Sequence, residues 1–203
     1  MKKKIILIGT GGHLISSINL IESLNSYKIA GLVSNSIIKK KILGYPIIGE
    51  DKDLSKIYKN ITDNCCIAIG QIKNNKTRYT IFKKLKKIGF KLPTLISKSV
   101  KIDKSTSIGE GTTIFHKCVI NSNVNIGSNC IINSGAIIEH DTTISDNCHI
   151  STGAILNGSV FVGKNTFIGS GTIIKNDLVI GKNCVIGMGE KIKRNLKNNS
   201  LIK

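Results

Sequence analysis

A six-residue rhythm in residues 132–174 decides the fold. The stretch reads INSGAIIEHDTTISDNCHISTGAILNGSVFVGKNTFIGSGTII, and a branched aliphatic residue returns at every sixth position. Followed in both directions, the rhythm occupies 17 positions from Ile96 to Ile192, of which 15 are Ile, one is Leu and one is Val. Neither an α-helix, with about 3.6 residues per turn, nor a simple alternating strand has this period.

The rhythm predicts a parallel β-helix built from hexapeptide repeats. Three hexads close one triangular coil, so each aliphatic side chain stacks on its counterpart one coil further along and fills a dry interior. Gly often follows the aliphatic residue, as at Gly109, Gly127 and Gly163, where it relieves the backbone at a turn. A stack of coils has open ends and flat outer faces, so we expect capping or oligomerisation.

The same register accounts for the thiols. Four of the six cysteines, Cys118, Cys130, Cys148 and Cys184, fall two residues before an inward aliphatic, a slot that Ala or Thr fills in many of the other hexads. The other two, Cys65 and Cys66, lie in an apolar strand without C-x-x-C spacing. We interpret all six as packing residues and assign neither a metal site nor a thiol nucleophile.

The first half has the pattern of a small α/β domain. Strands are predicted over 4–9, 29–34 and 65–70, and helices over 13–27, 52–59 and 75–89. Residues 92–97 then connect this half to the repeats. Strands that alternate with helices indicate a parallel sheet. We therefore divide the chain into residues 1–94, an α/β Rossmann-like domain, and residues 95–203, the β-helix.

Composition excludes several function classes. The net charge is +18, yet residues 105–190 hold 4 basic and 6 acidic residues, and aromatic residues make up only 4%. A nucleic-acid binder would show a basic stripe with aromatic side chains, so we expect no nucleic-acid partner. The basic excess is interpreted as a solvated surface, with attraction of an anionic small ligand as the alternative.

The chain starts MKKKIILIGTGGH, where a run of four apolar residues, Ile5 to Ile8, precedes a glycine cluster. This run is too short for a signal peptide or a membrane span, so a cytoplasmic location with reduced thiols is expected. The GTGGH turn fails the dinucleotide fingerprint because Leu14 stands where the third Gly is required. The backbone amides of Gly11, Gly12 and His13 can nevertheless hold a phosphate at a helix N-terminus, or the turn is merely structural.

Three ionisable residues follow the inward Ile138 on a coil turn: Glu139, His140 and Asp141. A carboxylate beside an imidazole fixes its tautomer and raises its basicity. The pattern therefore favours His140 as a general base, with either Glu139 or Asp141 as its partner.

Together with GYPIIGED and AIGQIKNNKTR, these motifs resemble the bacterial sugar acetyltransferases that have a left-handed β-helix. That group includes the N-acetyltransferases of bacillosamine-type amino sugars and the sialic acid O-acetyltransferases. The left hand of the coil and a homotrimer with active sites between neighbouring prisms are implied by this resemblance alone. It also implies acetyl-CoA as co-substrate and a role in surface glycan biosynthesis.

The resemblance assigns roles residue by residue. His140 matches the general base, and Asp141 or Glu139 matches the acid that orients it. Other positions match sites for the two substrates. For acetyl-CoA these are His149 near the thioester, the backbone amide of Gly158 at the acetyl carbonyl, and Gly169 and Ser170 along the pantetheine; for the sugar nucleotide they are Gly11, Gly12, His13 and Gly70.

Two departures from the family pattern stand out. Ser34 and Asn35 replace the acidic residues expected after the second strand, and the tail MGEKIKRNLKNNSLIK lacks the usual ending. Lys191, Lys193 and Arg194 of that tail are interpreted as solvated, with a contact to coenzyme A phosphates as the alternative. We expect transfer of acetyl to the amine of a nucleotide-linked amino sugar; the alternatives are sialic acid O-acetylation and a non-catalytic β-helix scaffold or binding module.

Overall fold

A computed structural model describes residues 2–35, 40–71 and 76–203 of the chain. They form two compact units: residues 2–70 with 76–93, and Gln71 with residues 94–203. Among the described residues, none of the helices has the length and apolar character needed to cross a membrane.

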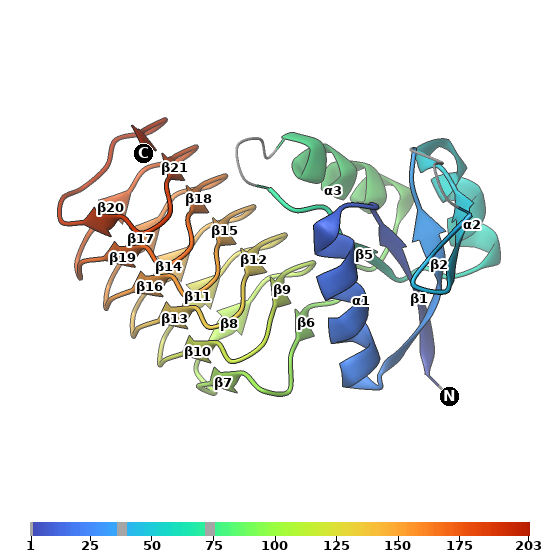
Figure 1. Cartoon of the computed structure of the whole chain (residues 1–203), viewed down its shortest axis with the longest axis horizontal. Coiled ribbons are helices and arrows are strands. Elements are labelled where there is room, and N and C mark those ends of the chain that lie inside the picture. The colour runs from blue at the N-terminus through green and yellow to red at the C-terminus, as the bar shows by residue number, and fades with distance from the viewer. Residues whose placement is uncertain (1, 36–39, 72–75) are drawn as a thin grey trace. The chain divides into compact units, whose positions relative to one another are not determined.

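The first unit is the expected α/β fold, with a five-stranded sheet in the order β3-β4-β2-β1-β5 (Figure 1). Strands β1, β2, β4 and β5 are parallel, and only β3 runs antiparallel, to β4. The strands are β1 (Lys3–Ile8), β2 (Tyr27–Val33), β3 (Lys41–Ile42), β4 (Tyr45–Gly49) and β5 (Cys65–Ile67). The helices are α1 (Gly12–Leu24), the short 3-10 helix η1 (Asp51–Asp53), α2 (Leu54–Asn60) and α3 (Lys76–Ile88).

Local chemistry sets these bounds. The run from Ile5 to Ile8 is fully buried, as the central strand of a parallel sheet requires. Helix α1 ends three residues earlier than the pattern predicts because Asn25 adopts a left-handed conformation, with φ of 57°. The predicted strand 65–70 ends at Ile67. The hairpin of β3 and β4 was not predicted, and parts of the basic loop before it and Asn75 lie outside the described residues.

The second unit is the expected left-handed parallel β-helix. Its strands form three faces, whose rows Figure 1 shows along the stack. The first face contains β7 (Lys101–Ile102), β10 (Val119–Ile120), β13 (Ile137–Ile138), β16 (Ile155–Leu156), β19 (Ile173–Ile174) and β22 (Lys191–Ile192). The second contains β8 (Ser107–Ile108), β11 (Asn125–Ile126), β14 (Thr143–Ile144), β17 (Phe161–Val162) and β20 (Val179–Ile180). The third contains β6 (Leu95–Ile96), β9 (Thr113–Ile114), β12 (Ile131–Ile132), β15 (His149–Ile150), β18 (Phe167–Ile168), β21 (Val185–Ile186) and β23 (Leu201–Ile202).

The register confirms the stacking predicted from the rhythm. Ile120 pairs with Ile138, Ile138 with Leu156, and Leu156 with Ile174, so each inward side chain lies on one 18 residues away. From Ile114 to Ile186 every sixth residue is at most 3% exposed. The four cysteines of the repeat are buried in the same core, as expected. The strands are only two residues long because each coil spends four of every six residues on its corners.

An asparagine ladder runs along the corner between the second and third faces. Each side-chain Nδ2 donates to the Oδ1 of the asparagine one coil further on, with distances of 2.8 to 3.0 Å. All five residues have φ between 56° and 63°, a conformation that Asn tolerates better than most residues. The ladder consists of Asn129, Asn147, Asn165, Asn183 and Asn199.

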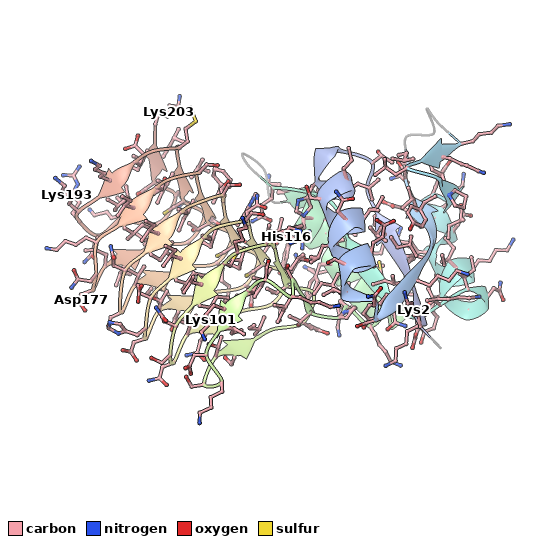
Figure 2. All side chains as sticks on the ribbon, turned by 60° about the horizontal axis from the view of Figure 1, so that its bottom comes forward. Lys2, Lys101, His116, Asp177, Lys193 and Lys203 are labelled. Carbon is pink, nitrogen blue, oxygen red and sulfur yellow. The ribbon has the colours of Figure 1, made fainter. Side chains whose placement is uncertain are left out.

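The C-terminal segment is not wholly a solvated tail. Ile192 is the last inward residue of the rhythm and is 6% exposed, and β23 pairs with β21 to complete the third face. The basic side chains nevertheless point to solvent, and Figure 2 shows Lys193 and Lys203 projecting away from the coils.

Candidate active site

The turn that carries His140 lies on the corner between the first and second faces, directly after β13. Residues in corresponding places on neighbouring coils, Asn123, Asp141, Ser159 and Asp177, all have φ close to 60°. Short polar side chains adopt this left-handed conformation more readily than branched ones do. The backbone of these four coils therefore turns in the same way directly after the preceding residue, which is His140 in the coil of Asp141. We call residues 139–142 the histidine corner.

Asp141 is the carboxylate that holds the imidazole. Its Oδ2 is 2.8 Å from Nδ1 of His140, and both side chains are more than half exposed. An ionised carboxylate only accepts, so Nδ1 carries the proton, and Nε2 of the neutral ring has a free lone pair. The hydrogen bond that His140 donates to Asp141, followed by the charges of Asp141, Glu139 and Asp177, raises the pKa of His140 above its usual value. The arrangement makes Nε2 a proton acceptor.

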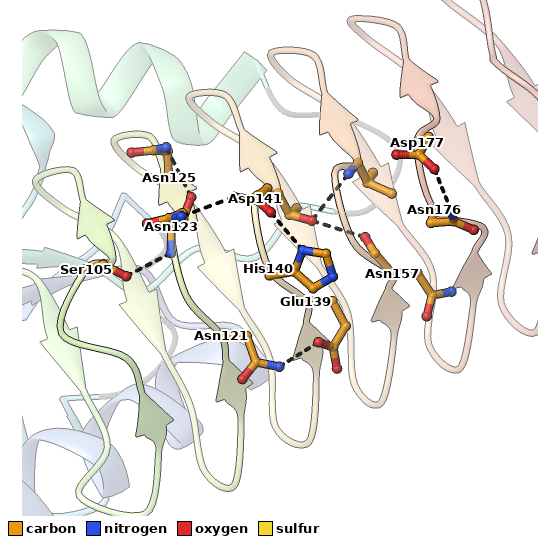
Figure 3. Close-up of polar contacts among 12 residues, drawn as sticks. Ser105, Asn121, Asn123, Asn125, Glu139, His140, Asp141, Asn157, Asn176 and Asp177 are labelled. Atoms are coloured by element: carbon orange, nitrogen blue, oxygen red, sulfur yellow. Dashed lines mark hydrogen bonds and ion pairs between the residues drawn. The ribbon is translucent and has the colours of Figure 1, made fainter.

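A second layer of asparagine side chains orients the two carboxylates. Asn123, one coil before Asp141, donates from Nδ2 to Oδ1 of Asp141 over 3.2 Å. Asn121 donates to Oε2 of Glu139 over 2.6 Å, and Glu139 is not hydrogen-bonded to the imidazole (Figure 3). The hydrogen bonds to His140 and Asn123 lower the pKa of Asp141. Sequence analysis left the choice between Glu139 and Asp141 open and missed both asparagines, which counting back one coil would have found.

Gly158 lies one coil after His140 and packs against its ring. A Cβ atom on Gly158 would lie 2.6 Å from Cε1 and 2.7 Å from Nε2 of His140. Only a residue without a side chain leaves room for the imidazole in this position. His140, Asp141 and Gly158 thus form one cluster, and three of the expected site residues are brought together.

His149, which the resemblance places near the thioester, is buried in the structure. It is 5% exposed on the third face, its Nδ1 donates to the backbone oxygen of Gln71, and its ring meets the edge of Phe167. Gln71 in turn donates to the backbone oxygen of Asn147 over 2.6 Å. His149 therefore anchors Gln71 to the β-helix in this single chain.

Gly169 and Ser170 line an elongated groove of about 750 Å³ on the last coils. The groove follows the third face and the corner between the third and first faces, with Phe167, Met188 and Leu201 among its walls. Ser170 shares a hydrogen bond of 2.9 Å with Ser151 at its inner end. Its apolar walls and size suit a long, partly apolar ligand. The groove and the histidine corner lie on different corners of the same chain.

The GTGGH turn of the first unit follows β1 and opens α1. Gly11 is the N-cap, and Gly12 and His13 are the first two residues of the helix. Gly9, Thr10 and Gly11 line a pocket of about 310 Å³ at the carboxyl end of the sheet. A Cβ atom on Gly70 would lie 3.6 Å from the Cβ of His13, but Gly12, His13 and Gly70 are not among the residues that line this pocket.

The cysteines have the properties of core residues. All six are free and buried, and burial raises the pKa of the thiols of Cys66 and Cys118 to about 11. Such thiols hold little of the nucleophilic thiolate near neutral pH. Among residues 2–35, 40–71 and 76–203, no group of three His, Cys, Asp or Glu side chains is arranged to hold a metal ion.

Two domain families match the chain. Residues 4–85 match the PglD N-terminal domain, and residues 90–196 match the GMPPB C-terminal domain. With an α/β unit of the first kind and a β-helix of the second, the chain is an acyltransferase of the hexapeptide-repeat class. It belongs to the bacterial sugar acetyltransferases that have a left-handed β-helix.

Solved structures agree with this assignment. A perosamine N-acetyltransferase variant from Caulobacter crescentus, in complex with CoA and GDP-perosamine, is 28% identical, with a TM-score of 0.92 over 98% of this chain and 92% of that one. The acetyltransferase domain of PglB from Neisseria gonorrhoeae FA1090, in complex with acetyl coenzyme A, is 25% identical, with a TM-score of 0.89 over 99% and 96%. WeeI from Acinetobacter baumannii AYE, at 22% identity and a TM-score of 0.85 over 98% and 96%, shows the same fold. No curated protein matches the chain in a sequence comparison.

Proposed function

We propose that the chain transfers the acetyl group of acetyl-CoA to the amine of a nucleotide-linked amino sugar in surface glycan biosynthesis, with His140 as general base. The single observation that carries the proposal is the pair of His140 and Asp141, 2.8 Å apart on an exposed corner, with Nε2 left as proton acceptor. The similarity to an enzyme solved with CoA and GDP-perosamine supports the two substrate classes.

In the proposed mechanism, the sugar amine attacks the thioester carbonyl while Nε2 of His140 takes a proton from the nitrogen. The negative charge on the carbonyl oxygen of the tetrahedral intermediate is stabilised by the backbone amide of Gly158. Collapse breaks the carbon–sulfur bond, and the thiolate of coenzyme A takes the proton from the imidazolium. The products are the N-acetyl sugar and coenzyme A, and the base is restored. An oxyanion donor of this kind contributes about 3–4 kcal/mol in other enzymes.

Acetyl-CoA is proposed to lie along the groove that Gly169 and Ser170 line, with its thioester toward His149. The apolar walls suit the pantetheine chain. Lys191 on the first face, and Lys193 and Arg194 in the same row of corners as His140, would offer cations for the phosphates of a coenzyme A bound in the groove of a neighbouring copy. The sugar nucleotide is proposed to bind residues 1–94 at Gly11, Gly12, His13 and Gly70, because a helix N-terminus favours a phosphate.

A homotrimer in the cytoplasm is part of the proposal. The groove and the histidine corner lie on different corners of the prism, so one chain alone does not bring acetyl donor and base together. Apolar side chains also point outward on both faces beside the histidine corner, and surfaces of this kind mark sites of association. They include Ile173, Phe161 and Val179, which are 38%, 43% and 49% exposed. A neighbouring copy that covers one of these faces would supply the missing groove.

Acetyl transfer from acetyl-CoA, measured as release of free coenzyme A, tests the proposal with a panel of nucleotide-linked 4-amino sugars and sialic acids. Turnover of an amino sugar that is lost in His140→Ala supports it. Turnover of sialic acids alone would establish the O-acetylation alternative, and binding of coenzyme A with no turnover of any acceptor would favour the scaffold.

A further inference from the structure

The pocket of the first unit has apolar walls and lies where open α/β sheets bind ligands. Its walls come from Ile8, Val33, Ile69 and Ile81, at the carboxyl ends of β1, β2 and β5 and on α3. The strand order places β2 and β5 on opposite sides of β1, so the strand order reverses at β1. Ligands of doubly wound sheets occupy the crevice at such a point.

Two kinds of polar group line this pocket. One is the turn of Gly9, Thr10 and Gly11, whose backbone leads into the N-terminus of α1 and favours an anion. The other is the pair of Asn35 and Asp51. A carboxylate repels phosphate, so in a nucleotide that binds here Asp51 faces the nucleoside and the turn faces the phosphates.

Asn35 and Asp51 are locked together by two hydrogen bonds. Nδ2 of Asn35 donates to Oδ2 of Asp51 over 3.0 Å, and the backbone nitrogen of Asp51 donates to Oδ1 of Asn35 over 2.9 Å. Lys84 also donates to the backbone oxygen of Asp51 over 2.7 Å. Within the described parts of the chain, Oδ1 of Asp51 accepts no hydrogen bond. A carboxylate reaches the end of β2 from the segment after β4, although the residues that directly follow β2 are Ser34 and Asn35.

The four bases offer different partners to a fixed carboxylate. Guanine presents two adjacent donors, N1–H and the exocyclic N2 amine, which match the two oxygens of a carboxylate. Uracil presents one N–H between two carbonyl oxygens, an edge that a free side-chain amide would match. The amide of Asn35 does not serve this purpose, because it is already hydrogen-bonded to Asp51. Adenine and cytosine each present a single amine beside an acceptor nitrogen.

We infer that Asp51, held by Asn35, recognises a guanine base and so selects a guanine nucleotide as the carrier of the sugar. The inference rests on the proposed function for the class of ligand, a nucleotide-linked sugar. It adds the identity of the base and the residue that recognises it.

Calorimetric titration of the full chain with GDP, IDP and UDP tests the inference. IDP differs from GDP only by the missing exocyclic amine. The unaltered chain should bind GDP at least about tenfold more tightly than IDP or UDP, since one bidentate contact discriminates by this order. In Asp51→Asn, binding of GDP should weaken at least about tenfold, and GDP and IDP should then bind within about threefold of one another.

The control is Asp63→Asn, which removes the same charge from a carboxylate that pairs with Lys91 outside the pocket. It should leave all three affinities within about twofold. Equal binding of GDP and UDP by the unaltered chain, or an equal loss of all three nucleotides in Asp51→Asn, would overturn the guanine inference but leave nucleotide binding intact. Failure of the unaltered chain to bind any of the three would overturn both the inference and the nucleotide-sugar proposal.

Discussion

Gly158 and the imidazole of His140 are so close that a single added carbon at Gly158 would lie 2.6 Å from Cε1 of the ring. The two residues are 18 apart in the sequence, one full coil of the β-helix. The backbone of Gly158 beneath the ring and the carboxylate of Asp141 beside it together fix the position of Nε2, the proton acceptor.

Gly158→Ala tests this steric relationship. Alanine keeps the backbone N–H, and φ at Gly158 is outside the left-handed region, so the variant adds only the clash. We expect the ring to rotate away from Asp141 and kcat to fall about 10²-fold, while KM for either substrate changes less than about threefold.

A double-mutant cycle provides the control for Gly158→Ala. In a His140→Ala background the added methyl has no ring to displace, so Gly158→Ala should cost nothing further. Equal losses in both backgrounds would mean that the glycine acts independently of His140.

The pH profile of kcat/KM tests the pairing of His140 with Asp141. Because the base must be neutral, activity should rise with pH through the raised pKa of His140, above the ordinary value of a histidine. Asp141→Asn removes the carboxylate that raises this pKa, so the acid limb should move to lower pH, and kcat should fall at least about tenfold. Glu139→Gln is the matched control and should shift the limb less, because Glu139 bonds Asn121 and not the ring. A limb that stays in place in Asp141→Asn would contradict the pairing.

The asparagine ladder should contribute measurably to stability. In Asn165→Gly the backbone keeps its left-handed conformation but loses the amide that links Asn147 to Asn183. We expect the free energy of unfolding to fall by about 1–3 kcal/mol, measured by denaturant titration. Asn125→Gly, at an exposed outward position, loses a hydrogen bond from Ser107 and a long one of 3.4 Å to the backbone of Asn123, and should cost less. A smaller cost at Asn165 than at Asn125 would show that the ladder is dispensable.

The thiols should be inert in the folded protein. Burial raises the pKa of Cys66 and Cys118 to about 11, so alkylation by iodoacetamide at pH 7.5 should be far slower than in denaturant, and acetyl transfer should survive it. Mass spectrometry of the protein treated in its native state measures the extent of alkylation. Rapid modification of any of the six, with loss of activity, would contradict their role as core residues.

The β-helix was predictable because its rule is local and repeated: each inward Ile lies at the same place in every hexad, from Ile96 to Ile192. The strand β4 was not, because GYPIIG joins the sheet by pairing with β2, a long-range contact that no local pattern encodes. The same holds for Asp51, which reaches the end of β2 from the 3-10 helix after β4, and for His149, which is hydrogen-bonded to the distant Gln71. His140 and Asp141 could be predicted because they are neighbours in the sequence.

The central claim is that His140, on the exposed corner of a stacked β-helix, removes the proton from an acceptor amine. The most direct test is the single-turnover rate of acetyl transfer from acetyl-CoA to a nucleotide-linked 4-amino sugar, in the unaltered chain and in His140→Ala, with acetyl-CoA binding measured in parallel. We predict that the rate falls at least about 10²-fold in the variant while acetyl-CoA binds with unchanged affinity. A variant that transfers acetyl within tenfold of the unaltered chain would contradict the claim.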